Sequence, residues 1–168
     1  VVYGISLVLL YLASTLYHSF TRKRVKDILK FFDHAAIYIL IAGNYTPFTL
    51  IPLHGTLGWS IFGIVWGLAL VGIIFQVFFV KRFRFLSTLC YLLMGWMAVL
   101  MVKPLLAVLP VAAIYWLVAG GILYTIGTVF YLDRKIPYNH AVWHLFVIGG
   151  SVTHFITVFK YVMPMPVV

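Results

Sequence analysis

The chain has 168 residues, of which 64% are hydrophobic and only 9% are charged, which excludes an ordinary soluble domain with about a quarter of its residues charged. The formal net charge of +9 would suit a nucleic-acid ligand, but the basic residues form short clusters between long apolar stretches, as in the loops of a membrane protein. We therefore expect membrane lipids around the chain and no nucleic-acid partner. Cys90 is the only cysteine, so an internal disulfide and a cysteine-rich metal motif are both excluded.

Six stretches are long and apolar enough to cross a bilayer as helices, which takes about 20 mostly apolar residues. These runs are continuously apolar rather than alternating, which favours helices over the strands of a barrel. The connections are short, so consecutive helices should be antiparallel neighbours in one all-α bundle. We expect residues 1–168 to form a single transmembrane domain. The six predicted spans are 1–20, 31–51, 57–80, 84–102, 107–131 and 138–160.

The first span begins at Val1 without an initiator methionine or a signal-peptide pattern, so we expect a chain that lacks its N-terminal part. Lysine and arginine are divided unequally among the loops, with only Lys103 and Lys160 on the side of the even-numbered loops. The positive-inside rule therefore places the odd-numbered loops in the cytoplasm and the C-terminus outside. One further helix before Val1 would place the true N-terminus inside. The odd-numbered loops carry Arg22, Lys23, Arg24, Lys26, Lys30, Lys81, Arg82, Arg84, Arg134 and Lys135.

Four ionisable residues lie at a similar depth near the predicted cytoplasmic face. His18 ends the first span, Asp33 begins the second, and His140 and His144 begin the last. With a rise of about 1.5 Å per residue, all four fall within roughly 5–15 Å of the same membrane face. Polar groups inside a bilayer are costly and tend to face the bundle interior at functional sites, so this clustering predicts a site shared by three helices.

The spacing of these residues is that of a metal site. His140 and His144 are four residues apart and share one helix face, and Ser14 and His18 repeat this spacing. Two histidines from one helix and a third from another can hold Zn²⁺ and leave a fourth position for water. Asp33 could then accept a proton from that water, and Ser14 could orient a ligand. Interhelical hydrogen bonds or a proton relay are the alternatives for the histidines. Asp33 could also cap its helix or pair with a lysine, and Ser14 could serve only in packing.

The other histidines fit such a site less well. His34 points about 100° away from Asp33 around the helix, which predicts an interfacial position. His54 lies in the predicted outer turn. His154 follows His144 by ten residues, about 15 Å along a helix, and is expected to be a hydrogen-bonded interior residue. Tyr138 and Trp143 flank the predicted site but suit the aromatic belt of a membrane protein.

Three motifs together resemble the bacterial hemolysin III family. They are Ser14-x-x-x-His18, the run from Phe32 to Phe48 that contains FDHAAIYILIAG and YTPF, and His140-Ala-Val-Trp-His144. That family is grouped with the progestin and adiponectin receptors and, more distantly, with the alkaline ceramidases. It has seven transmembrane helices, so the chain would correspond to the second through the seventh. The resemblance covers essentially the whole chain.

The resemblance implies a role for each candidate residue. His18, His140 and His144 match the zinc ligands, Asp33 matches the carboxylate that holds water, and Ser14 matches the accompanying serine. Metal-dependent hydrolases of lipid amides in the wider group suggest ceramide-like substrates, and the family name implies cytolytic activity. A bacterial inner membrane is the expected location.

Three functions are compatible with this sequence. The leading hypothesis is a zinc-dependent intramembrane hydrolase of a lipid amide or ester, with its lipid substrate held in the bundle. The second is a pore-forming, cytolytic or ion-homeostasis protein whose polar residues line a pathway. The third is a receptor-like sensor in which zinc is structural. The sequence predicts no oligomeric state.

Overall fold

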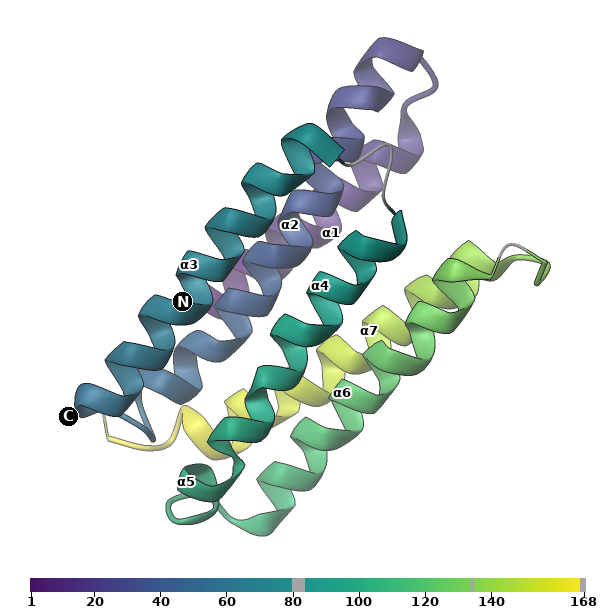
Figure 1. Ribbon diagram of the computed structural model, residues 1–168. Helices are drawn as coiled ribbons and strands as arrows, with labels where there is room; N and C mark the ends of the chain where they lie inside the picture. Colours follow the sequence, from purple (N-terminus) through teal and green to yellow (C-terminus); the bar gives the residue numbers. More distant parts are fainter. Residues whose placement is uncertain (80–83, 134, 167–168) are drawn as a thin grey trace.

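A computed structural model describes residues 1–79, 84–133 and 135–166, which form a bundle of long helices running side by side (Figure 1). Lys81, Arg82 and Arg134, which contribute to the predicted orientation, lie outside these ranges. The prediction of an all-helical bundle is confirmed for the described part. Its first three elements are α1 (Val2–Ser19), α2 (Lys23–Leu50) and α3 (Gly55–Phe79). Six follow: α4 (Arg84–Trp96), the 3₁₀ segment η1 (Met97–Met101), α5 (Val102–Leu106), α6 (Val111–Leu132), α7 (Asn139–Thr157) and the π-helical turn η2 (Val158–Val162).

Within the described ranges, five helical stretches are long and apolar enough to cross a bilayer, which confirms five of the six predicted spans. The remaining helix, α2, has 28 residues and is also long enough, but it is more polar. Part of this polarity lies in the basic segment at its beginning. The polar residues farther along are tolerated because α2 contacts α1, α3 and α4, which shield it from lipid. The five stretches are Val2–Ser19, Gly55–Val77, Arg84–Leu106, Val111–Leu132 and Asn139–Val162.

Two predicted connections are wrong because they are largely helical. The basic segment before residue 31 was expected to be a loop, but α2 already begins at Lys23. Lysine and arginine are good helix formers, so their charge marks the depth of the segment rather than the end of the helix. The expected break at Lys103-Pro104 is also absent, since α5 continues to Leu106. Pro104 falls in the first turn of α5, where its missing N–H group costs little.

Glycines allow two pairs of helices to approach closely. A Cβ atom at Gly43 of α2 would lie 2.3 Å from the hydroxyl oxygen of Ser6 in α1. A Cβ atom at Gly120 of α6 would lie 2.3 Å from the His154 ring in α7. Small residues at helix interfaces are the usual means of close packing inside membranes. These contacts help to fix how α1 lies against α2 and how α7 lies against α6. The candidate ligand histidines are on α1 and α7.

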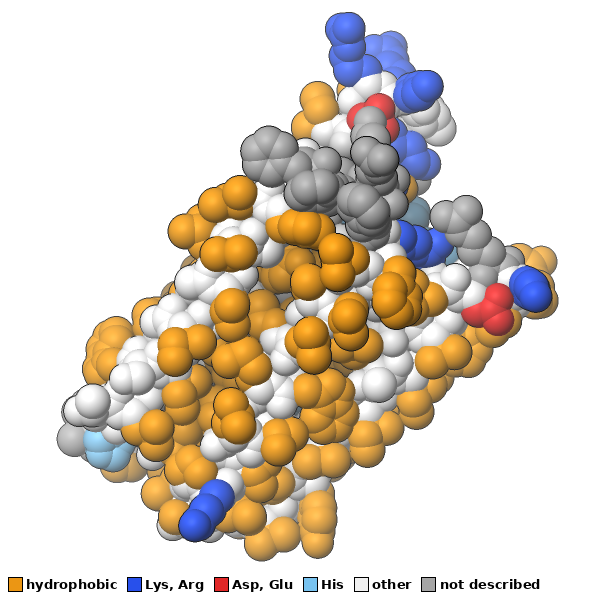
Figure 2. Space-filling view, viewed as in Figure 1, with side chains coloured by type: hydrophobic (Ala, Val, Ile, Leu, Met, Phe, Trp, Pro, Cys, Tyr) orange, Lys and Arg blue, Asp and Glu red, His pale blue; other side chains and the backbone are white. Residues whose placement is uncertain are grey.

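The outer surface of the bundle is apolar. Figure 2 shows hydrophobic side chains over most of the visible face, with lysine and arginine gathered mainly toward one end. Leu70, Leu100 and Leu145 are 60%, 76% and 68% exposed. Soluble monomers rarely expose apolar patches of such extent. The chain is therefore an integral membrane protein.

Candidate metal centre

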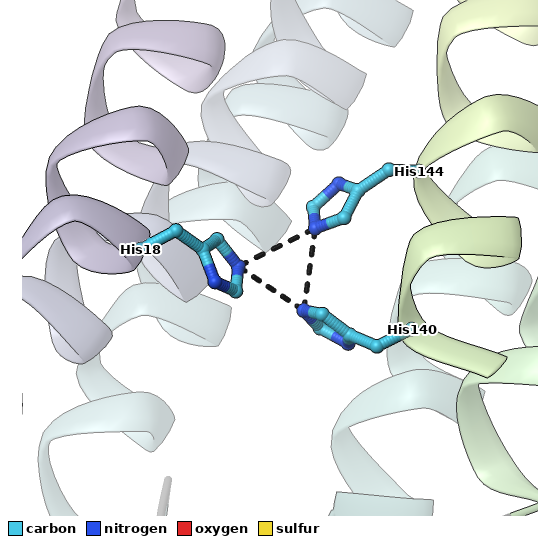
Figure 3. A group of neighbouring side chains, drawn as sticks. All are labelled: His18, His140 and His144. Carbon is cyan, nitrogen blue, oxygen red and sulfur yellow. Dashed lines mark hydrogen bonds between the residues drawn. The ribbon is translucent and has the colours of Figure 1, made fainter. Parts of the chain in front are cut away.

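The three predicted ligand histidines meet at one end of the bundle. His18 lies in the last turn of α1, and His140 and His144 lie on one face of α7 at its beginning. Their Nε2 atoms point toward one another (Figure 3). The distances between them are 3.1 Å for His18–His140, 3.4 Å for His18–His144 and 3.2 Å for His140–His144. Residues more than 120 positions apart in the sequence thus form a compact triangle of nitrogens.

Hydrogen bonding alone cannot satisfy this triangle. In neutral imidazole one ring nitrogen carries a proton and the other carries a lone pair. Among three Nε2 atoms at least two must be in the same state, so at least one side joins two donors or two acceptors. A single cation resolves the conflict, because all three nitrogens can then direct lone pairs to its centre.

The size of the triangle also fits one metal ion. Three nitrogens at 2.0–2.1 Å from a tetrahedral ion are separated by about 3.3–3.4 Å, close to the separations among the three histidines. His18 is exposed, whereas His140 and His144 are half-buried. The three residues could therefore form a metal site that opens toward the end of the bundle.

A cavity of about 520 Å³ runs from this triangle into the bundle. Its size lies within the range of small-molecule sites, which is about 300–1,000 Å³. Side chains such as Ile41, Val147 and Leu105 make most of its wall apolar. Five predicted site residues line this one cavity: Ser14, His18, Asp33, His140 and His144.

Asp33 lies in the cavity wall with only 14% of its side chain exposed. Ser14 of α1 lines the same cavity. One carboxylate oxygen of Asp33 lies 3.7 Å from Nδ1 of His34. The arrangement provides a proton acceptor next to His34, in the wall of the same cavity as the candidate metal site.

The predicted interfacial position of His34 is wrong. Its side chain is only 13% exposed, and it lines the cavity. Its Nδ1–H donates to the Lys30 carbonyl at 2.9 Å, so its Nε2 accepts from the Tyr131 hydroxyl at 3.3 Å. The error arises because α2 is enclosed by other helices on more than one side, so a 100° turn away from Asp33 still faces protein.

The sequence of this chain is similar to known membrane proteins along nearly its whole length. Residues 1–155 match the family described as haemolysin-III related. The chain belongs to the haemolysin III family. It is 56% identical to "Hemolysin-3 homolog" of Bacillus subtilis (strain 168) over 165 residues, which cover 98% of this chain and 78% of that protein. It is 53% identical to "Hemolysin-3" of Bacillus cereus over 163 residues, 97% of this chain and 74% of the relative.

The relationship of this haemolysin III family member extends to animal proteins. The human "Monocyte to macrophage differentiation factor" is 29% identical over 171 residues, which cover 98% of this chain and 71% of that protein. These matches confirm the resemblance that the three motifs indicate, including the distant link to the progestin and adiponectin receptors. No solved structure matches the chain.

His154 occupies the interior position predicted for it. It is 8% exposed, and its Nε2–H donates to the Leu117 carbonyl at 3.0 Å. Its Nδ1 therefore accepts from the side-chain amide of Asn44 at 2.7 Å. Both residues line the cavity, so this haemolysin III family member has a second polar position deep in its cavity, about 15 Å beyond His144 along α7.

Arg84 lines the cavity, although the sequence predicts it to be one of the loop charges. Its guanidinium carbon lies 3.9 Å from the centre of the Tyr131 ring, and its Nη2 donates to the Tyr131 carbonyl. The Tyr131 ring in turn lies 6.2 Å from the His140 ring, centre to centre. The missed signal is a polar stripe on α4 with i, i+3, i+4 and i+7 spacing, which marks an inward face. The stripe consists of Arg84, Ser87, Thr88 and Tyr91, all of which line the cavity.

Proposed function

We propose that this haemolysin III family member is a zinc-dependent intramembrane hydrolase that cleaves an amide or ester bond of a lipid. The supporting observation is the convergence of three Nε2 atoms in a triangle that no arrangement of imidazole protons satisfies. Zinc suits this donor set, because catalytic zinc sites use three protein ligands and leave the fourth position open. His18, His140 and His144 would hold the ion.

The proposed reaction adds water across the scissile bond. Zinc, when bound, would polarise the substrate carbonyl and activate water near neutral pH. Asp33 takes the proton of the attacking water and returns it to the nitrogen or oxygen that leaves, while the acyl carbon keeps the hydroxyl group. Ser14, which lines the same cavity, orients the bound substrate or the Asp33 carboxylate through its hydroxyl group. These roles divide metal binding and proton transfer between different residues, so they can be tested separately.

The cavity supports a lipid as the substrate. Its apolar wall can hold a hydrocarbon chain and keep bulk water away from the bond that breaks, and its polar end carries the histidines and Asp33. An amphiphile with its amide or ester at the polar end matches this division. The loop charges support an orientation with this end in the cytoplasm, and relatives from Bacillus support a bacterial plasma membrane.

A cytolytic function is the second candidate, suggested by the name of the Bacillus cereus relative, "Hemolysin-3".

The hydrogen bonds of His154, deep in the cavity, argue against a proton pathway through this residue. Its Nε2–H is bonded to the carbonyl of Leu117, and a backbone carbonyl has no proton to pass on. A receptor-like sensor with structural zinc would require the same three histidines but not Asp33.

A turnover assay with purified protein in detergent tests the proposal. Release of fatty acid is measured from an N-acyl sphingoid base and from an acyl ester of equal chain length, alongside dye leakage from liposomes. We expect wild type to hydrolyse at least one substrate, His140→Ala to lose both metal and turnover, and Asp33→Asn to keep metal and lose turnover. His54→Ala, an exposed residue outside the cavity, is the matched control. Dye release that persists in His140→Ala, without hydrolysis in wild type, would instead establish the cytolytic function.

A further inference from the structure

The end of the α1–α2 hairpin carries a second depression that the proposed hydrolase does not use. It has a volume of about 290 Å³ and lies where α2 begins. Lys23, Lys26 and Lys30 have i, i+3 and i+7 spacing, so they share one face of α2. The depression is lined by these three lysines together with Tyr17, Thr21 and Asp27.

The charge of this depression favours an anionic ligand. Three lysines and one aspartate give it a formal excess of two positive charges. The ammonium group of Lys26 lies 5.3 Å from the centre of the Tyr17 ring, so a cation–π contact holds it beside the phenol. Hydroxyl groups of Tyr17 and Thr21 add neutral donors. Ammonium and hydroxyl donors around one hollow are the groups that bind phosphate oxygens.

Apolar residues on the other side of the same helix place this face at the membrane surface. Ile28 and Phe32 are 55% and 54% exposed, and their positions in the sequence put them opposite the three lysines on α2. Phe20, in the connection before α2, is 44% exposed. Basic residues at the end of a membrane-spanning helix lie near the lipid headgroups, and the apolar residues on its other side contact the acyl chains. The lysines are therefore at the level of the lipid phosphates, and Figure 2 shows the blue side chains gathered at this end.

We propose that Lys23, Lys26 and Lys30, together with Tyr17 and Thr21, form a binding site for the phosphate-bearing headgroup of an anionic membrane lipid. Tyr17 and Lys30 line both this depression and the histidine cavity, so a lipid held here lies beside the cavity mouth. The site depends on neither a metal nor hydrolysis. It therefore stands independently of the proposed function.

The experiment measures lipid binding to the full chain in neutral detergent, by native mass spectrometry or displacement of a fluorescent lipid. Phosphatidylglycerol is compared with phosphatidylcholine of the same acyl chains. The double variant Lys23→Gln/Lys26→Gln should weaken phosphatidylglycerol binding at least tenfold and leave phosphatidylcholine unchanged, since each basic residue near an anionic surface contributes about a fivefold effect. The matched control is Arg22→Gln/Arg24→Gln, which removes the same charge from the same hairpin but not from the depression.

Three outcomes overturn the proposal. Equal weakening by the lysine and arginine variants would show diffuse attraction rather than a site. Equal affinity of wild type for both lipids would show that the headgroup charge is not recognised. Displacement of phosphatidylglycerol by inorganic phosphate at equal concentration would show that a free anion, not a lipid, is the ligand.

Three further variants keep the result interpretable. Lys26→Arg keeps the charge and should retain most of the binding even if the double glutamine variant unfolds, whereas Lys26→Gln alone should lose part of it. Loss of binding in Lys26→Arg equal to that in Lys26→Gln contradicts a charge-based site. His140→Ala should bind phosphatidylglycerol as wild type does, and this result separates the lipid site from the hydrolase.

Discussion

Replacing Gly120 by alanine should destabilise the bundle measurably. The added Cβ would lie 2.3 Å from two atoms of the His154 ring and 2.6 Å from the hydroxyl oxygen of Thr153, so α6 and α7 must separate or the ring must move. Overpacking of this kind costs about 1–3 kcal/mol. Loss of the bond from His154 to the Leu117 carbonyl costs about 1 kcal/mol more, and the higher helix propensity of alanine returns up to about 1 kcal/mol. The net loss is about 1–3 kcal/mol.

Thermal unfolding in detergent measures this effect. A loss of this size lowers Tm by several degrees in a chain of 150–250 residues, at about 2–4 °C per kcal/mol. Gly121→Ala is the matched control, because its Cβ would meet only the Trp96 ring at 3.7 Å, an ordinary contact. Equal Tm values for the two variants would refute the close packing of α6 on His154. A metal affinity that falls with Tm in Gly120→Ala alone would connect this packing to the α7 histidines.

Three further predictions concern the site and its approach. Asp33→Asn should bind metal as wild type does but lower kcat at least about 100-fold; loss of metal instead would make Asp33 a ligand. Metal affinity should fall as the pH is lowered from 7 to 5, because protons compete with the metal for the imidazole lone pairs; a metal affinity that does not change over this pH range would contradict histidine ligation. Tyr138 is 86% exposed and has a φ of 56°, a left-handed backbone conformation that is strained for tyrosine but not for glycine. Tyr138→Gly should therefore raise the free energy of unfolding by about 1 kcal/mol. An unchanged or lower Tm would contradict this backbone strain.

The histidines of the candidate centre could be predicted because they depend on local geometry. The four-residue spacing of His140 and His144 fixes their common face on any helix. The short connections and the alternating direction of the helices bring the end of α1 and the beginning of α7 to the same membrane face. His18 could therefore be assigned to the site from its predicted depth in the membrane alone. The structure adds the fact that these two helix ends meet, which depth does not determine.

The residues that could not be predicted depend on which helices enclose which. His34 was assigned to the interface because the position of α2 in the middle of the bundle is a property of tertiary packing. Arg84 stands at the start of a span among other basic residues, and only the approach of α4 to α6 places it over Tyr131. The start of α2 at Lys23 was missed for a different reason, because a cluster of charge was taken as a loop although it is compatible with a helix.

Metal content is the most direct test of the central claim that three imidazoles share one cation. Protein purified in neutral detergent without added chelator is analysed for zinc and other first-row metals, with His140→Ala and His54→Ala alongside. We expect about one zinc ion per chain in wild type and in His54→Ala. In His140→Ala we expect only a small fraction of that zinc content. Wild-type protein without stoichiometric zinc, or equal zinc in His140→Ala, would contradict the claim.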